Sequence, residues 1–180
     1  EALADETQRM EGSVVVVGGG NVAVDCARTA VRFGAAKVSM VCLESRETMP
    51  ASDDEIYEAE EEHIAICAGW GPKEVLKDEN GHVTAIVFKK CIRTIDPETK
   101  RFAPVYDEDE TMTIAADHVV FAIGQAIEWG GLLAGTKVEF HRGNYPVADP
   151  LTYQTAEEDI FVGGDVYHGP KFVIDAIEEG

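Results

Sequence analysis

The sequence is poor in basic residues, with 15 Lys and Arg against 34 Asp and Glu and a formal net charge of −19. So negative a chain repels the phosphates of nucleic acids and of anionic membrane surfaces, and we expect it to bind neither. No apolar run approaches the ~18 residues of a membrane-spanning helix, and no charged segment followed by an apolar one forms a leader. We therefore expect a cytoplasmic protein.

Cysteine is also sparse, and none of the four residues belongs to a CxxC pair. Each lies in or beside an apolar run, so we expect reduced, buried thiols and no cysteine redox centre. The five histidines lack the paired spacing of metal ligands, and we expect neither a metal site nor a catalytic side chain. The cysteines are Cys26, Cys42, Cys67 and Cys91.

The first apolar pattern predicts a strand, a helix and a second strand. Residues 14–17 are consecutive valines, typical of a central parallel strand that is covered on both faces. Glycines follow, and apolar residues then recur at helical spacing from Asn21 until Gly34 ends the helix. Residues 37–42 predict the second strand, with a right-handed connection between the two.

An acidic helix and a short strand are expected next. Ser52 and Glu55 have the spacing of a capping box, which predicts a helix that runs to about His63. Within it, the acidic stretch 58–62 indicates a solvent-exposed face, and the alternative is an interface with a basic partner. Residues 64–67 are then expected to form a third strand.

A hairpin and a returning strand complete this region. An Asn-Gly pair at 80–81 separates the strand pattern 74–76 from the alternating pattern 83–95, which predicts an antiparallel meander with 111–114 as its further strand. The apolar run 118–124 then predicts another buried parallel strand, which returns the chain to the main sheet.

Beyond residue 125 the pattern changes. Short strands are expected at 138–140 and 160–162, and a helix is expected from Pro170 onward. The sequence ends at Gly180 on the apolar stripe of that helix, which indicates a piece of a longer protein. We expect three regions: a linker at 1–12, a dinucleotide-binding domain at 13–124 and a partial domain at 125–180.

One glycine motif predicts a binding site. Gly18-x-Gly20-x-x-Ala23, between a buried strand and a helix, is a dinucleotide fingerprint in the form that ends with Ala. Gly18 permits a tight turn, Gly20 lets the backbone approach a pyrophosphate, and Ala23 allows close packing of helix and strand. Free amides near Asn21 and Val22 would face the phosphates. The alternative is a glycine-rich turn without a ligand.

The end of the second strand is expected to meet the adenosine ribose. A carboxylate at Glu44 accepts hydrogen bonds from both ribose hydroxyls and repels a 2′-phosphate, whereas Arg46 neutralises one. Because Glu44 is closer to the strand end, the sequence favours NAD(H) over NADP(H). The alternative for Glu44 is a surface acid paired with Arg46.

One family matches four segments of this sequence, SVVVVGGGNVAVDCARTAVRFGA, SRETMPAS, VVFAIGQ and EEDIFVGGDV. They resemble the small (beta) subunit of glutamate synthase and its relatives in the flavin-dependent pyridine nucleotide-disulfide oxidoreductase group. The resemblance implies an α/β, Rossmann-like, three-layer NAD(P)-binding domain, with a parallel sheet plus an antiparallel β-meander, followed by a C-terminal piece of an FAD-binding domain. It also implies electron flow from NAD(P)H to FAD and on to iron–sulfur clusters, which domains or subunits outside this chain would hold.

The resemblance also implies site residues. Gly124 and Gln125 resemble the crossover strand between the two domains, and residues 163–165 resemble a second flavin motif. Many relatives have two arginines where this chain has Leu43 and Glu44, which argues against NADP(H). The expected cofactor-binding residues are Gly18, Gly19, Gly20, Asn21, Val22, Ala23, Glu44, Ser45, Arg46, Gly124, Gln125, Gly164 and Asp165.

The sequence lacks a first flavin glycine motif and any iron–sulfur cysteines. Half of an FAD site does not enclose a flavin, so we expect FAD only in the full-length protein and expect this chain alone to be inactive. For Asp165 the alternative is a turn aspartate that caps the following segment.

Two other functions stay open. A thioredoxin-reductase-like disulfide reductase has the same two-dinucleotide architecture but requires a CxxC or equivalent redox pair, which the sequence lacks. An NAD(H)-sensing regulatory module without redox chemistry needs no flavin motif, so the VVFAIGQ and IFVGGDV segments argue against it.

Overall fold

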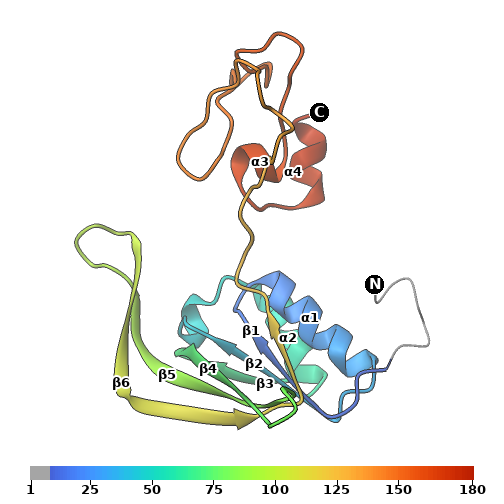
Figure 1. Cartoon of the computed structure of the whole chain (residues 1–180), viewed down its shortest axis with the longest axis vertical. Helices are drawn as coiled ribbons and strands as arrows, with labels where there is room; N and C mark the ends of the chain where they lie inside the picture. Colours follow the sequence, from blue (N-terminus) through green and yellow to red (C-terminus); the bar gives the residue numbers. More distant parts are fainter. Residues whose placement is uncertain (1–8) are drawn as a thin grey trace. The chain divides into compact units, whose positions relative to one another are not determined.

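The computed structural model describes residues 9–180 (Figure 1). The chain divides into two compact units, residues 1–123 and residues 124–180, which are described one after the other. Of the linker expected at 1–12, residues 1–8 lie outside the described residues. In the described part of the chain, no helix is long and apolar enough to cross a membrane.

A four-stranded parallel sheet forms the centre of the first unit (Figure 1). The strand order is β3-β2-β1-β7, so β1 has its successor β2 on one side and the returning strand β7 on the other. Val16 of β1 accordingly lies beside Met40 and Val120. The strands are β1 Ser13–Val17, β2 Lys37–Cys42, β3 Ala65–Ala68 and β7 His118–Phe121.

Both faces of this sheet are covered, which explains the unbroken valine run of β1. The helices are α1, Asn21–Arg32, and α2, Asp53–Glu61. Val14 and Val16 pack in one core cluster with these helices, whereas Val15 and Val17 pack in a second cluster with Phe88 of the antiparallel sheet. Because successive side chains of a strand point to opposite faces, only a strand covered on both faces is apolar throughout. The expected three-layer fold is confirmed.

The third layer is an antiparallel sheet in the order β4-β5-β6. A tight turn joins its first two strands, and Gly81 in that turn has a φ of +86°, a conformation that favours glycine. The expected meander is confirmed, and its last strand is much longer than the predicted 111–114. The strands are β4 Trp70–Lys77, β5 Val83–Ile95 and β6 Phe102–Ala115.

Strand β7 differs from the prediction at its C-terminal end. It pairs in parallel with β1 as expected, but it ends at Phe121 instead of Gly124. The strand lies at the edge of the described sheet, and the Phe121 side chain is 52% exposed. Its expected burial was wrong, because an apolar run does not reveal whether another element of the same chain covers it.

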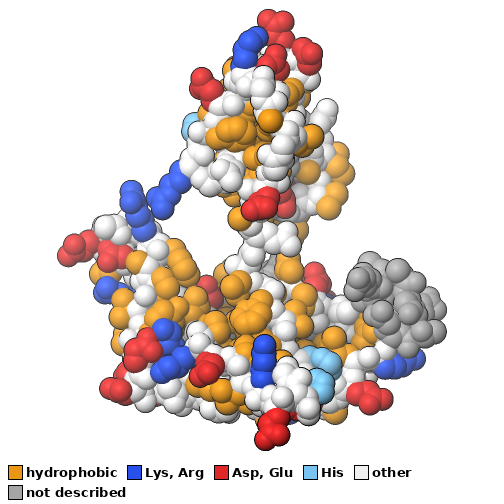
Figure 2. Space-filling model, in the orientation of Figure 1, with side chains coloured by type: hydrophobic (Ala, Val, Ile, Leu, Met, Phe, Trp, Pro, Cys, Tyr) orange, Lys and Arg blue, Asp and Glu red, His pale blue; other side chains and the backbone are white. Residues whose placement is uncertain are grey.

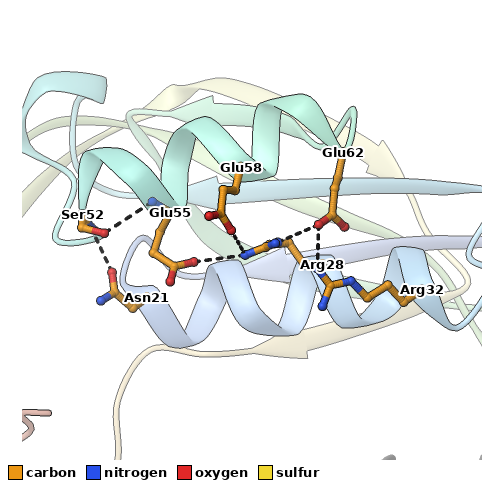
Figure 3. A network of polar contacts seen from close by, with 7 residues as sticks. All are labelled: Asn21, Arg28, Arg32, Ser52, Glu55, Glu58 and Glu62. Atoms are coloured by element: carbon orange, nitrogen blue, oxygen red, sulfur yellow. Dashed lines mark hydrogen bonds and ion pairs between the residues drawn. The ribbon is translucent and has the colours of Figure 1, made fainter.

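Ion pairs join α1 to α2 (Figure 3). The Arg28 guanidinium of α1 contacts the carboxylates of Glu55 and Glu58 on α2 and of Glu62, the C-cap of α2. Glu62 also accepts a 2.8 Å hydrogen bond from Arg32. The hydrogen bond from Arg28 is the main cause that lowers the pKa of Glu62. Since the Arg28 side chain is only 18% exposed, part of the acidic stretch expected to face solvent serves as a helix–helix contact, while Glu58 and Glu60 stay 49% exposed.

The second unit, residues 124–180, has little regular structure. The strands expected at 138–140 and 160–162 are wrong, because these segments form only isolated bridges, such as the one between Phe140 and Pro146. Turns interrupt the segments before a ladder of several hydrogen bonds can form. The helices of this unit are α3, Asp165–His168, and α4, Val173–Glu178, of which α4 is the helix expected from Pro170.

Candidate functional site

The glycine loop begins where β1 ends. Gly18 has a φ of +147°, and a Cβ on it would overlap the carbonyl oxygen of Ala122, just after β7. The Gly18 N–H donates to the Val41 carbonyl at 2.9 Å, and the Ala122 N–H donates to the Val17 carbonyl at 2.8 Å. Backbone from three neighbouring strands therefore meets at this turn, and the fold itself requires glycine at position 18.

Nothing in the described chain requires glycine at position 20. Gly20 is the N-cap of α1 with φ −93° and ψ 175°, an extended conformation that any residue adopts. A Cβ on Gly20 would meet no atom within 4 Å. Glycine at a position where neither the backbone conformation nor a steric contact requires it is typical of a place where a ligand approaches the backbone closely. Gly20 thus leaves open a space that a side chain would fill.

Unpaired amides surround this space. Within residues 9–180, the backbone N–H groups of Gly20, Asn21 and Val22 have no hydrogen-bond acceptor. Helix α1 has neither a side-chain cap nor an acidic residue in its first turn. Free N–H groups at the positive end of a helix dipole favour an anion such as a phosphate.

Close packing places α1 directly over the sheet. A Cβ on Gly19 would lie 2.9 Å from the Cβ of Cys42 and 3.1 Å from Oε2 of Glu44. The buried Ala23 has its methyl carbon 3.2 Å from the position of a Cβ on Gly18. Small residues at these three positions therefore allow the helix to start immediately above β1 and β2.

The start of α2 is fixed to the start of α1 (Figure 3). The Ser52 N–H donates to Oδ1 of Asn21 at 2.9 Å, and Ser52 Oγ accepts from the Glu55 N–H at 3.4 Å. The second bond is the expected first half of a capping box. The other half was wrong, because the Glu55 carboxylate lies 3.5 Å from Arg28 and the Asn21 side chain binds the Ser52 amide in its place.

The segment after β2 carries the charged residues expected at the ribose. Arg46 pairs with Glu60 of α2 at 2.9 Å, so the alternative in which it pairs with Glu44 is wrong. Glu44 instead directs its carboxylate toward Gly19. Ser45 lies in the same turn as Arg46 and hydrogen-bonds within it. A carboxylate therefore borders the glycine loop.

The thiol nearest to the loop is that of Cys42. Burial, and then the negative charge of Glu44, raise its pKa to about 11, so it stays protonated at neutral pH. All four cysteines are free; Cys42 and Cys91 are buried as expected, whereas Cys26 and Cys67 are only partly buried. Among the residues that the structure describes, no group of three or more His, Cys, Asp or Glu side chains is placed to hold a metal.

A cleft of about 790 Å³ opens beside Glu44. Its walls are the segment 43–50, which follows β2, and the segment 90–95 of β5 together with Phe102. Ser45 and Arg46 line the first wall. The sequence pattern gave no sign of the second wall, because an alternating strand does not reveal which loop its side chains will meet.

The remaining expected residues belong to the second unit. Gly124 and Gln125 are exposed in the segment that follows β7. The Gly164 N–H donates to the carboxylate of Glu179, and Asp165 at the start of α3 accepts a backbone N–H from six residues further on at 3.3 Å. The Gly164 amide is thus paired with Glu179 within the second unit.

Comparison with known proteins identifies a matching family and relatives of similar sequence. A family model described as pyridine nucleotide-disulphide oxidoreductase matches residues 1–180. The chain is 36% identical over 180 residues to the NADP(+)-dependent formate dehydrogenase subunit beta of Moorella thermoacetica, covering 98% of this chain and 25% of that protein. It is 35% identical over 182 residues to the glutamate synthase [NADPH] small chain of Escherichia coli strain K12, covering 95% of this chain and 37% of that protein.

A solved structure has the same fold. Thioredoxin reductase of T. acidophilum matches with a TM-score of 0.73 at 19% sequence identity, over 93% of this chain and 48% of that one. An identity this low supports the likeness of fold alone. In length the chain spans 25% of the formate dehydrogenase subunit and 37% of the glutamate synthase chain.

Proposed function

Because the chain belongs to the pyridine nucleotide-disulphide oxidoreductase family, we propose that residues 13–124 bind a nicotinamide dinucleotide, NAD(H) or NADP(H). Flavoproteins of this family use FAD together with NAD(P)H. We extend the proposal to the whole protein, as a glutamate synthase small subunit-like oxidoreductase. Its chemistry is hydride transfer from NAD(P)H to FAD, with electrons passed on to iron–sulfur clusters in domains or subunits outside this chain.

The observation that carries the proposal is the open space at Gly20. Packing explains Gly18 and Gly19, whereas no contact within the described chain explains Gly20, whose neighbours also carry unpaired amides. An open backbone with several unpaired amides suits a pyrophosphate, which accepts hydrogen bonds from several N–H groups. The acidic side chains of the chain are dispersed over the face drawn in Figure 2 and do not form one patch. The net negative charge of the chain repels an anionic dinucleotide at long range, but salt screens this repulsion. Binding therefore relies on short-range contacts between the phosphates and the backbone amides.

The part of this chain in such a reaction is to hold and orient the dinucleotide. Hydride transfer depends on position more than on acids and bases. The amides of Gly20, Asn21 and Val22 bind the pyrophosphate, and Glu44 accepts a hydrogen bond from the ribose. The protonated Cys42 thiol takes no part, because its pKa lies near 11. We also propose that the protein is located in the cytoplasm, where free thiols such as its four cysteines stay reduced.

Calorimetric titration with NADH and NADPH tests the proposal. We expect saturable binding of at least one dinucleotide at a single site. Gly20→Val fills the open space with a β-branched side chain that suits the extended backbone there, and we expect it to weaken binding at least ~tenfold without unfolding the chain. Gly131→Val is the matched control, since a Cβ on Gly131 also meets nothing within 4 Å. Wild-type chain that binds neither dinucleotide contradicts the proposal.

A further inference from the structure

Glu44 borders both the glycine loop and the cleft. The Glu44 carboxylate lies next to Gly19, and the same residue lines the cleft. In dinucleotide-binding folds the pyrophosphate lies on the first glycine turn, and the adenosine ribose lies at the carboxyl end of the second strand. A dinucleotide held by this loop would therefore extend its adenosine end toward the cleft, whose volume of about 790 Å³ is within the range of small-molecule sites.

The cleft has more positive than negative lining side chains, although the chain as a whole has a net charge of −19. Arg46 lies on one wall, Lys90 and Arg93 lie on the other, and Glu44 is the opposing carboxylate. Two of these cations have weak ties within the chain: Arg93 is 3.9 Å from Asp96 with its side chain 47% exposed, and the Lys90 ammonium lies 4.6 Å over the Trp70 ring. Arg46 is held more firmly, at 2.9 Å from Glu60.

The two cations of β5 lie in an irregular part of the strand. Lys90 and Arg93 are three positions apart, so a regular strand would direct them to opposite faces. The pairing of β5 with β6 shifts register between Lys89 and Lys90, between Cys91 and Arg93, and again after Arg93. Such bulges twist a strand and re-aim its side chains, and they are common beside functional sites.

We propose that this cleft selects NADP(H) over NAD(H), with Arg93 and Lys90 of β5 and Arg46 after β2 as the groups that favour the 2′-phosphate. The proposal rests on the proposed dinucleotide function and names the form of its ligand. It reverses the preference for NAD(H) drawn from Glu44, because that preference considered only the residues after β2. Guanidinium groups match phosphate oxygens in two-point hydrogen bonds, so Arg93 is expected to contribute most.

Paired titrations test this selection. We expect NADPH to bind the wild-type chain at least ~tenfold more tightly than NADH, and 2′,5′-ADP to bind more tightly than 5′-AMP. Arg93→Ala should weaken NADPH at least ~tenfold and leave NADH within about threefold, and Lys90→Ala should do the same to a smaller degree. Arg142→Ala removes an equal charge from the second unit and should change neither affinity.

The salt dependence of the two affinities tests the same selection without any variant. Because the 2′-phosphate adds charge to the ligand, NADPH affinity should fall more steeply with salt than NADH affinity. Equal or tighter NADH binding, or an Arg93→Ala variant that weakens both dinucleotides alike, overturns the selection and leaves the proposed function standing. Failure of both dinucleotides to bind overturns the proposed function and, with it, this inference.

Discussion

The backbone N–H of Ser52 donates a 2.9 Å hydrogen bond to Oδ1 of Asn21, and this one contact ties the first turn of α2 to the first turn of α1. It leaves the Asn21 backbone N–H free to face a ligand. Asn21 therefore has two separate functions, a side chain that holds the fold and an amide that belongs to the proposed phosphate site. The two can be separated by experiment.

Asn21→Asp should impair binding without impairing the fold. An aspartate keeps the oxygen that accepts the Ser52 N–H, and its negative charge interacts favourably with the N-terminus of α1. We expect the free energy of unfolding in urea to stay within about 1 kcal/mol of wild type. NADPH affinity in calorimetry should fall at least ~tenfold, because a carboxylate now lies beside the pyrophosphate.

The matched control is Asn80→Asp, the same change in the turn between β4 and β5, which suits either residue. It should leave the affinity for NADPH unchanged. Unchanged affinity in Asn21→Asp would show that the phosphates bind away from α1.

Alanine at the two ends of the glycine loop should have very unequal effects on stability. Gly18→Ala forces a Cβ against the Ala122 carbonyl at a φ of +147°, and we expect it to destabilise the chain by about 2–3 kcal/mol or more. Gly20→Ala introduces no contact, and its restriction of the unfolded chain opposes the poorer N-cap that alanine makes, so stability should change by less than about 1 kcal/mol. Urea denaturation measures both, and comparable losses in the two variants would contradict the assignment of Gly20 to a ligand.

The parallel layer could be predicted from the sequence because local pattern and burial agree there. Val14 to Val17 are apolar at every position, which only a doubly covered strand requires. The meander also carries its own local signal in the Asn-Gly turn. Residues such as Gly18 and Ala23 could be given packing roles for the same reason, since their roles follow from adjacent elements.

Contacts between elements distant in the sequence could not be predicted in this way. The capping box predicted that Glu55 would reach back to Ser52, but Arg28 on another helix attracts its carboxylate. Arg46 likewise pairs with Glu60 on α2 instead of the nearby Glu44. Neither partner has a fixed spacing along the chain, so only the packed structure reveals them. The cations of β5 were missed for the same reason.

The Arg28–Glu62 pair should make the first unit sensitive to acid. The folded pKa of Glu62 lies below its ordinary value of 4.5, chiefly because Arg28 donates a hydrogen bond to it. A lowered folded pKa means that the contribution is fully present above about pH 4.5 and is lost as the pH falls through the folded value. Glu62→Gln should therefore destabilise the chain at pH 7 by about 1 kcal/mol, with a smaller difference at pH 3.

Urea denaturation at several pH values between 3 and 7 measures that difference. Glu79→Gln, in the turn between β4 and β5, is the control for a carboxylate outside the ion-pair network. A difference between wild type and Glu62→Gln that does not shrink on acidification would contradict the role of this pair.

Cys42 should be inert as a nucleophile. With a pKa of about 11 against an ordinary value of 9.0, its thiolate fraction at neutral pH is reduced roughly a hundredfold, and burial restricts access further. We expect iodoacetamide to modify Cys42 in the folded chain at least ~a hundredfold more slowly than in urea, as followed by peptide mass spectrometry. Rapid modification in the folded chain would identify a reactive thiol beside the glycine loop.

The most direct test of dinucleotide binding is to observe the backbone amides of Gly20, Asn21 and Val22 in nuclear magnetic resonance spectra during titration with NADPH. These groups have no acceptor within the described chain, so hydrogen bonds to a pyrophosphate should shift their proton resonances downfield with a common saturation curve. Distant amides such as that of Gly81 should stay unchanged. Saturating NADPH that leaves all three resonances in place would contradict the account.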